Sequence, residues 1–304
     1  MATKPATERS DVDIDGVLPL VRSDAERANL LLESLGRFFP GFGRLFVVAP
    51  ARDLSALEET LRPPSELEMT LVAETQVAPE LEASRARGWY KQQLVKLAIY
   101  EHVNTSFYLT FDADVVATRP VAPEDLVVNG RGLCHVIPED LHPDWYRDTE
   151  RFLARPLRRR GVLHAVTPAL LATDAVRALV EAQDRRAREG RWSRGRAGWR
   201  QRWGRARGRQ GWRSFLLDGL PWTEYALYHS WLELEGLADR YHHEAPPGIY
   251  DVERSVWKKD ADRFDAWDPS PLFRGEGPPW FAVIQSNTRL APSRLREKLE
   301  PFLR

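Results

Sequence analysis

The chain has 304 residues, enough to bury a sizeable core as one large α/β domain or as two closely joined halves. Its 44 basic and 44 acidic residues cancel, so no overall field points to nucleic acid or to a membrane surface. The single cysteine, Cys134, excludes an intramolecular disulfide framework and is expected to be an inert core thiol. The polar N-terminus resembles no secretory signal, and no apolar run has the length of a membrane span. A soluble cytoplasmic protein is therefore expected.

Strand and helix patterns alternate through the first half of the chain. After a tail over residues 1–13 that is expected to be disordered, the predicted elements are strands at 14–20, 44–49 and 66–73 and helices at 23–38, 54–61 and 88–103. This order predicts a mainly parallel central sheet with helices on both faces. Ligands of such sheets bind beyond the carboxyl ends of the strands.

The first strand runs directly into a helix that Ser23 and Glu26 are expected to open with a capping box. Backbone N–H groups and the helix dipole favour anions at such a junction, which Val21, Arg22 and Asp24 would line. The alternative is an ordinary strand-to-helix turn.

Two aspartates directly after a predicted buried strand are the main indication of function. The strand is the apolar run 106–111, and Asp112 and Asp114 follow it, where an extended backbone would project both side chains to the same side. Two desolvated carboxylates oppose each other unless a cation lies between them, and oxygen ligands suit a divalent metal. The alternative is a strand-end aspartate that caps a turn. On the preceding helix, Gln92 and Lys96 lie one turn apart, and Lys96 either balances phosphate charge in the site or is a solvated surface lysine.

The stretch 185–213 breaks this pattern. It holds twelve arginines and four tryptophans against one acid, Glu189, a net charge of +11. We expect a flexible basic insertion that docks on the acidic remainder of the protein or contacts an acceptor or an anionic surface, with nucleic acid a less favoured partner.

The order of these segments resembles the nucleotide-sugar-binding half of GT-A glycosyltransferases. More narrowly, the chain is similar to a bacterial GT-A-like group catalogued as a domain of unknown function. The resemblance covers roughly 14–290 and rests on four segments: 88–97 (GWYKQQLVKL), 108–116 (YLTFDADVV), 222–228 (WTEYALY) and 283–288 (VIQSNT).

The resemblance implies a GT-A-like, Rossmann-like fold in which 14–130 binds the donor and 131–304 builds the acceptor side. It implies a nucleotide diphospho-sugar donor, with a UDP-sugar the commonest in the family, and an acceptor that is a cell-surface glycan or a small molecule. In this family the first aspartate, here Asp112, reaches the ribose or a metal-bound water, and the second, Asp114, holds Mn²⁺ or Mg²⁺.

Further site residues are expected in the second half. Thr223 looks like a helix N-cap with Glu224 in the first turn, which by itself explains Glu224. The resemblance adds a role for Glu224 as general base toward the acceptor hydroxyl. It also implies a third metal ligand, for which His243 or His242 is a candidate, with Gln285 or Asn287 on the final strand as alternatives.

Some segments allow functional and structural interpretations. His142 and Trp145 would contact an acceptor or belong to a plain surface loop, which is favoured. His164 would touch a sugar or, as is favoured, be a satisfied core histidine.

Two other functions compete with the glycosyltransferase. The sequence Phe-Asp-Ala-Asp-Val-Val also fits a haloacid-dehalogenase-like phosphatase with Asp112 as nucleophile and Asp114 as acid/base. It ranks second because the motif follows three strands instead of ending the first. The third possibility is a non-catalytic GT-A-fold binding protein that docks through the basic insertion.

Overall fold

The structure is a computed structural model, and it describes residues 13–137, 142–157, 163–164, 167–188, 211–217 and 222–304. The expected disordered tail and most of the basic insertion lie outside these ranges. Within them, no helix is both long and apolar enough to cross a membrane.

The centre of the protein is a five-stranded sheet in the order β10-β4-β1-β2-β3. Its strands are β1 (Ile14–Pro19), β2 (Leu45–Ala49), β3 (Met69–Ala73), β4 (Phe107–Thr110) and β10 (Ala169–Ala172). The first four pair in parallel, and β10 closes the β4 edge antiparallel. Every residue of β1, β2 and β4 is buried, including the polar Asp15 and Thr110, because both faces of a parallel sheet are covered. The mixed α/β fold with a mostly parallel sheet is thereby confirmed.

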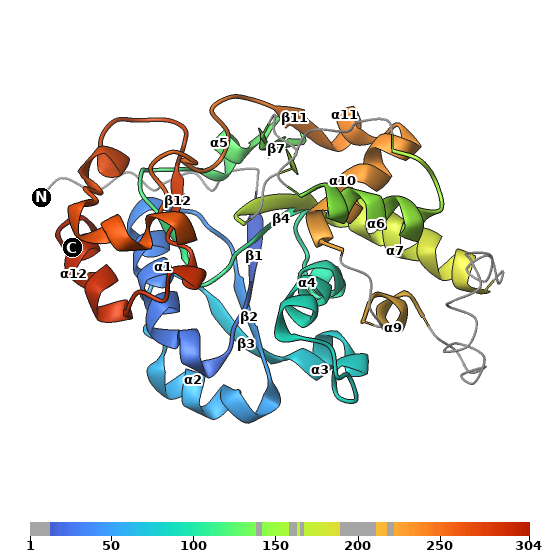
Figure 1. Cartoon of the computed structure of the whole chain (residues 1–304), viewed down its shortest axis with the longest axis horizontal. Coiled ribbons are helices and arrows are strands. Elements are labelled where there is room, and N and C mark those ends of the chain that lie inside the picture. The colour runs from blue at the N-terminus through green and yellow to red at the C-terminus, as the bar shows by residue number, and fades with distance from the viewer. Residues whose placement is uncertain (1–12, 138–141, 158–162, 165–166, 189–210, 218–221) are drawn as a thin grey trace, which may run out of the picture.

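Helices cover both faces of this sheet (Figure 1). On one side lie α1 (Ala25–Phe38), α2 (Leu54–Thr60) and the terminal α12 (Pro292–Leu303). On the other side lie α4 (Gly88–Ala98), α6 (Pro143–Leu153), α7 (Thr173–Arg188) and α10 (Glu224–Glu235). The shorter helices are α3 (Glu74–Val77), α5 (Pro123–Leu126), α9 (Trp212–Leu217) and α11 (Ala238–Tyr241).

Three small sheets complete the fold. The strand β5 (Val115–Ala117) pairs antiparallel with β12 (Phe281–Val283), so the chain after the aspartates leaves the main sheet. A second sheet contains β6 (Val127–Val128), β7 (Arg131–Cys134) and β11 (His242–Glu244). The third pairs β8 (Val136–Ile137) with β9 (Leu163–His164).

Two local predictions are wrong. No capping box opens α1: a 3-10 turn over Arg22–Asp24 precedes it, and the Asp24 side chain makes no capping bond. The basic insertion is shorter than 185–213, because residues 185–188 form the end of α7 and Trp212 begins α9. Trp212 is buried, and its N–H donates to Asp184 Oδ1 at 3.0 Å, which ties α9 to α7.

One apolar core joins the two halves of the chain, running from Ile14 on β1 to Val283 on β12. It is tight around Gly16, where an added Cβ would lie 2.6 Å from Phe42 Cζ and 3.2 Å from Phe111 Cε2. Phe111 directly precedes Asp112, so core packing at β1 also fixes the start of the acidic turn.

We therefore expect Gly16→Ala to lower the free energy of unfolding by about 1–3 kcal/mol, because both rings must move in a packed core. The matched control is Gly88→Ala in the first turn of α4, where a Cβ meets nothing within 4 Å. Chemical denaturation of both variants checks the prediction, which fails if Gly16→Ala is as stable as Gly88→Ala.

Candidate functional site

The two aspartates lie on a turn directly after β4. The Val115 N–H donates to Asp112 O at 3.2 Å, so the backbone between them is folded and not extended as predicted. The turn sends the chain into β5, whose partner β12 holds the other side: Ile284 N–H donates to Asp114 O at 2.8 Å. Both carboxylates nevertheless face the same space, at the carboxyl end of the parallel sheet.

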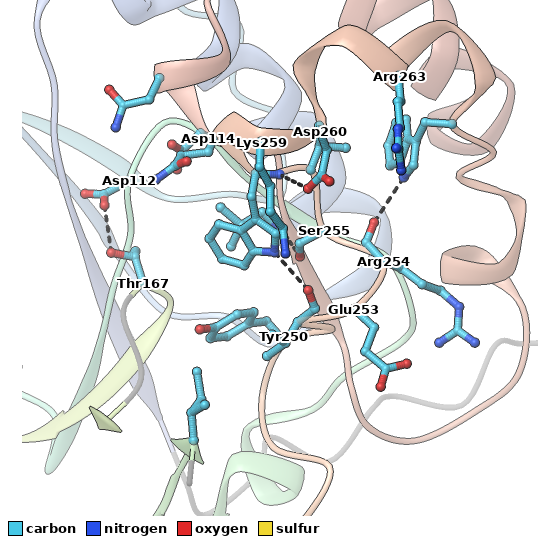
Figure 2. A pocket seen from close by; sticks show the side chains of 18 of the residues that line it. Asp112, Asp114, Thr167, Tyr250, Glu253, Arg254, Ser255, Lys259, Asp260 and Arg263 are labelled. Carbon is cyan, nitrogen blue, oxygen red and sulfur yellow. Dashed lines mark hydrogen bonds between the residues drawn. The ribbon is translucent and has the colours of Figure 1, made fainter. Parts of the chain in front are cut away.

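That space is a cavity of about 1150 Å³. Asp112, Asp114 and Thr167 lie at one end, and the segment 250–271 forms the opposite wall with Glu253, Arg254, Lys259, Asp260 and Arg263 (Figure 2). Aromatic rings line the cavity in two groups: Trp89 from α4 with His142 and Trp145 at the start of α6, and Tyr250, Trp257 and Trp267 within the segment 250–271.

Asp112 is held by two neighbours. Its Oδ1 accepts from Lys96 Nζ at 2.8 Å, and its Oδ2 accepts from Thr167 Oγ1 at 2.8 Å. Its side chain is 39% exposed, whereas that of Lys96 is 4% exposed. Asp112 therefore presents a fixed carboxylate to the cavity with a buried cation behind it.

Lys96 is shared between two acids. Its Nζ lies 3.1 Å from Glu224 Oε1 as well as 2.8 Å from Asp112, and it donates to Thr167 Oγ1 at 3.1 Å and Tyr225 OH at 3.4 Å. Burial alone would lower the pKa of Lys96, but the nearby Asp112 and Glu224 outweigh it and hold the pKa well above its usual value. Lys96 is therefore charged, and its charge is already neutralised.

Glu224 begins α10 and is buried, with its side chain 3% exposed. Thr223 is the N-cap, as predicted, and accepts from the Ala226 N–H at 3.0 Å. The Glu224 N–H donates to Gln93 Oε1 at 3.2 Å. Burial raises the pKa of Glu224 and Lys96 opposes the rise. Glu224 does not line the cavity, so it reaches the site only through Lys96.

Asp114 is anchored from the C-terminal segment and from α1. Its Oδ2 accepts from the Ser286 N–H at 2.9 Å. Arg27 interacts with it electrostatically and is fixed by donating to the carbonyls of Ile284 and Leu290. Burial and the neighbouring Asp112 raise the pKa of Asp114 to about 6, against the opposing effects of Ser286 and Arg27. Negative charge at this point is therefore incompletely compensated.

The charges around the turn do not balance. Asp24 belongs to the same group, since it interacts with both Arg27 and Asp112 and burial raises its pKa. With all groups ionised, four carboxylates face two cations, a net charge of −2. The members are Asp24, Asp112, Asp114 and Glu224 against Arg27 and Lys96.

The predicted donor-site residues are only partly brought together. Lys96 meets Asp112, but Gln92 is half-exposed and outside the cavity lining, while its neighbour Gln93 is buried against α10. Val21 and Arg22 follow β1 without lining the cavity, and the Arg22 N–H donates to Asp53 Oδ2 at 3.2 Å.

The structure does not bring His242 or His243 to the aspartates. The two histidines lie on β11, which pairs with β7 in a separate sheet. The His242 ring lies 6.1 Å from Phe107, at the opposite end of β4, and five residues at about 3.3 Å each separate Phe107 from Asp112. The predicted ligand His243 therefore lies on β11, away from the two aspartates. Gln285 and Asn287 do line the cavity, although they follow β12 instead of lying on it. Gln285 Oε1 already accepts from the Lys258 N–H at 3.0 Å.

His142 and Trp145 are candidate acceptor contacts in the sequence, although a plain surface loop is the favoured prediction for them. His142 and Trp145 lie at the start of a helix, not in a plain surface loop, and their rings stack with centroids 3.8 Å apart. Thr167 gave no signal, because only the pairing of β10 with β4 brings it to Asp112. Arg27 had one: it follows Asp24 by three residues on the same helix face.

Residues 11–304 match a family of unknown function, DUF6492. The chain belongs to this family. No curated protein matches it. The apo crystal structure of mouse xyloside xylosyltransferase 1 superposes with a TM-score of 0.49 at 12% identity, covering 92% of this chain and all of that one.

The buried lysine generates a stability prediction. Lys96→Met should lower the free energy of unfolding by about 3–5 kcal/mol, because it leaves Glu224 buried without its cation. The double variant Lys96→Met/Glu224→Gln should be more stable than Lys96→Met alone. Denaturant titrations of both measure this, and equal stability of the two would show that Glu224 is not paired with Lys96.

Asp114 generates a pH prediction for the metal-free protein. Its pKa rises from 3.8 to about 6 on folding, so between these values the folded state holds a proton that the unfolded chain has released. The contribution of Asp114 to stability should therefore fall as pH rises from about 4 to 6 and then level off. Asp114→Asn should remove this slope, and the exposed Asp239→Asn should keep it. Unfolding titrations across that pH range provide the measurement.

Proposed function

We propose that this protein is a metal-dependent glycosyltransferase that moves a sugar from a nucleotide diphospho-sugar to a glycan or small-molecule acceptor. The observation that carries the proposal is the net charge of −2 around Asp112 and Asp114, at the carboxyl end of a parallel sheet and open to a large cavity. One divalent cation would neutralise that charge.

The residues present fit such a cation. Asp112 and Asp114 supply hard carboxylate oxygens, which Mn²⁺ and Mg²⁺ prefer. Asn287 lines the same cavity and adds an amide oxygen, so we assign it the third protein ligand in place of His243. When bound, the metal would act as a Lewis acid toward the diphosphate and help to stabilise the departing nucleotide. Lys96 and Thr167 fix Asp112, and Ser286 fixes Asp114, so the carboxylates are oriented before the ion arrives.

The donor phosphates need positive charge beyond the metal. Lys96 does not supply it, because its charge is shared between Asp112 and Glu224. Lys259 and Arg263 line the opposite wall, and neither forms an ion pair with a carboxylate in the described part of the chain. We assign phosphate binding to these two side chains in place of the turn at Val21, Arg22 and Asp24, which does not line the cavity.

The acceptor has an aromatic surface available. The Trp89 and Trp145 rings lie 6.0 Å apart, His142 stacks on Trp145, and Trp89 is 44% exposed. Apolar ring faces beside polar groups suit a sugar or another flat small molecule. Glu253 and Asp260 line the cavity, so a general base is available there without Glu224, which we assign to positioning Asp112 through Lys96.

The two competing functions give different roles to Asp112 and Asp114. A phosphatase needs Asp112 as a nucleophile and Asp114 as acid/base, so each aspartate would be required for phosphate release. A non-catalytic binding protein requires neither aspartate for its partner. Neither alternative has a specific observation in its favour.

The test is calorimetric titration of UDP, GDP and CDP, each with and without Mn²⁺. We expect metal-dependent binding of one nucleotide, and an affinity loss of at least about 100-fold in Asp114→Asn, because an uncharged amide replaces a metal ligand. Asp239→Asn, an exposed aspartate on α11, is the matched control and should bind as the wild type does.

The nucleotide that binds then selects the sugar series for a donor-hydrolysis assay. Absence of nucleotide binding with every metal tested would contradict the proposal. Phosphate release from a generic aryl phosphate that is lost in Asp112→Asn would favour the phosphatase instead.

A further inference from the structure

A second cluster of metal-ligating side chains lies away from the cavity. Cys134 on β7, His164 on β9 and His229 on α10 each place one ligand atom so that the three atoms lie within 4.8 Å of one another. All three residues are buried, and none lines the cavity of the aspartates. The three come from separate elements, so their meeting is a product of the fold.

The spacing is close to that of a zinc site. Cys134 Sγ lies 3.9 Å from His229 Nδ1 and 4.0 Å from His229 Nε2. Tetrahedral zinc, with Zn–S of about 2.3 Å and Zn–N of about 2.0–2.1 Å, requires S···N of about 3.6 Å. Because Sγ is almost equidistant from the two ring nitrogens, the His229 ring must turn as well as approach by about 0.3–0.4 Å before one nitrogen faces the ion.

The side chains of this cluster do not suit Mn²⁺ or Mg²⁺, the ions expected at the two aspartates. Thiolate and imidazole are soft and borderline ligands that select zinc, whereas Mn²⁺ and Mg²⁺ prefer oxygen. Glu233 follows His229 by one helical turn, and its Oε1 lies 3.7 Å from His164 Nε2. A carboxylate placed there can complete the coordination or orient the His164 ring.

Binding demands one local rearrangement. The rings of His164 and His229 are stacked, with centroids 4.3 Å apart and planes 6° from parallel. Each nitrogen lone pair lies in the plane of its ring, so two parallel rings cannot both point at one ion. Both rings must therefore turn, and His164 would exchange the contact of its Nδ1 with Tyr146 OH at 3.3 Å or of its Nε2 with Glu233 Oε1 at 3.7 Å for the ion.

We propose that Cys134, His164 and His229 bind a structural zinc ion that joins β7 and β9 to α10. The helix α10 begins with Glu224 and Tyr225, which contact Lys96. An ion that holds α10 in place would therefore also help to hold Lys96 beside Asp112. This site is separate from the proposed transferase centre and needs no nucleotide.

The test uses the full chain with Co²⁺ as the spectroscopic probe. The reduced, metal-free protein should develop a thiolate-to-cobalt charge-transfer band and the visible bands of a four-coordinate ion at about one equivalent. The chain has only one cysteine, so that band identifies Cys134. Zinc should displace the cobalt, and the protein as purified should contain about one zinc per chain by elemental analysis.

Single substitutions test whether Cys134 and His229 are the ligands of the bound metal. Cys134→Ser should abolish the charge-transfer band, and His229→Asn should weaken cobalt binding at least about 100-fold. His243→Asn, a half-exposed histidine on β11, is the matched control and should retain both the band and the zinc. Chelation should lower the Tm of the wild type and of His243→Asn, but not that of Cys134→Ser.

The Co²⁺ titration of the wild type decides the question even if a variant does not fold. Absence of the charge-transfer band in the reduced wild type, together with no bound zinc, overturns the proposal and leaves a histidine stack that only packs the core. Loss of nucleotide binding in Asp114→Asn, by contrast, would leave the cobalt spectrum unchanged.

Discussion

A buried ammonium group between two carboxylates is the interaction on which the candidate site depends. Lys96 Nζ reaches Asp112 and Glu224 at 2.8 and 3.1 Å, while its own side chain is 4% exposed. A charge buried this deeply is tolerated only when it is paired and hydrogen-bonded, and here Thr167 and Tyr225 complete the set. The lysine therefore joins α4, α10 and the end of β4 at one point.

The turn after β4 determines which groups surround Asp112 and Asp114. Because β5 leaves the main sheet to pair with β12, the C-terminal segment comes to lie over the aspartates, and Ser286 binds Asp114 directly. The cavity is thus enclosed by residues more than a hundred positions apart in the sequence. The two acids have different environments: Asp112 has an ammonium partner, whereas Asp114 has backbone and a more distant arginine. Burial and the neighbouring Asp112 raise the pKa of Asp114, and its weaker partners leave a negative charge that a cation would balance.

Much of the fold could be predicted because its signals are local. The apolar runs at 14–20, 44–49 and 106–111 are buried strands, and Thr223 caps α10. The prediction failed where partners are distant. The sequence around Asp24 fits a capping box, yet the chain forms a 3-10 turn there, and Trp212 looked like part of a loop until its packing on α7 was visible. Side chains such as Thr167 and Gln93 carry no pattern that marks them as site residues.

By itself, the sequence determined the strand and helix order and the presence of two carboxylates at the end of a buried strand, since periodicity and turn chemistry act over a few residues. The tertiary structure decided which groups share that space. It placed His242 and its neighbour His243 beside the other end of β4 and Glu224 behind Lys96 instead of in the cavity, and it brought Cys134 to His229. These choices follow from strand pairing and core packing, which join residues about a hundred positions apart and leave no periodic trace in the sequence.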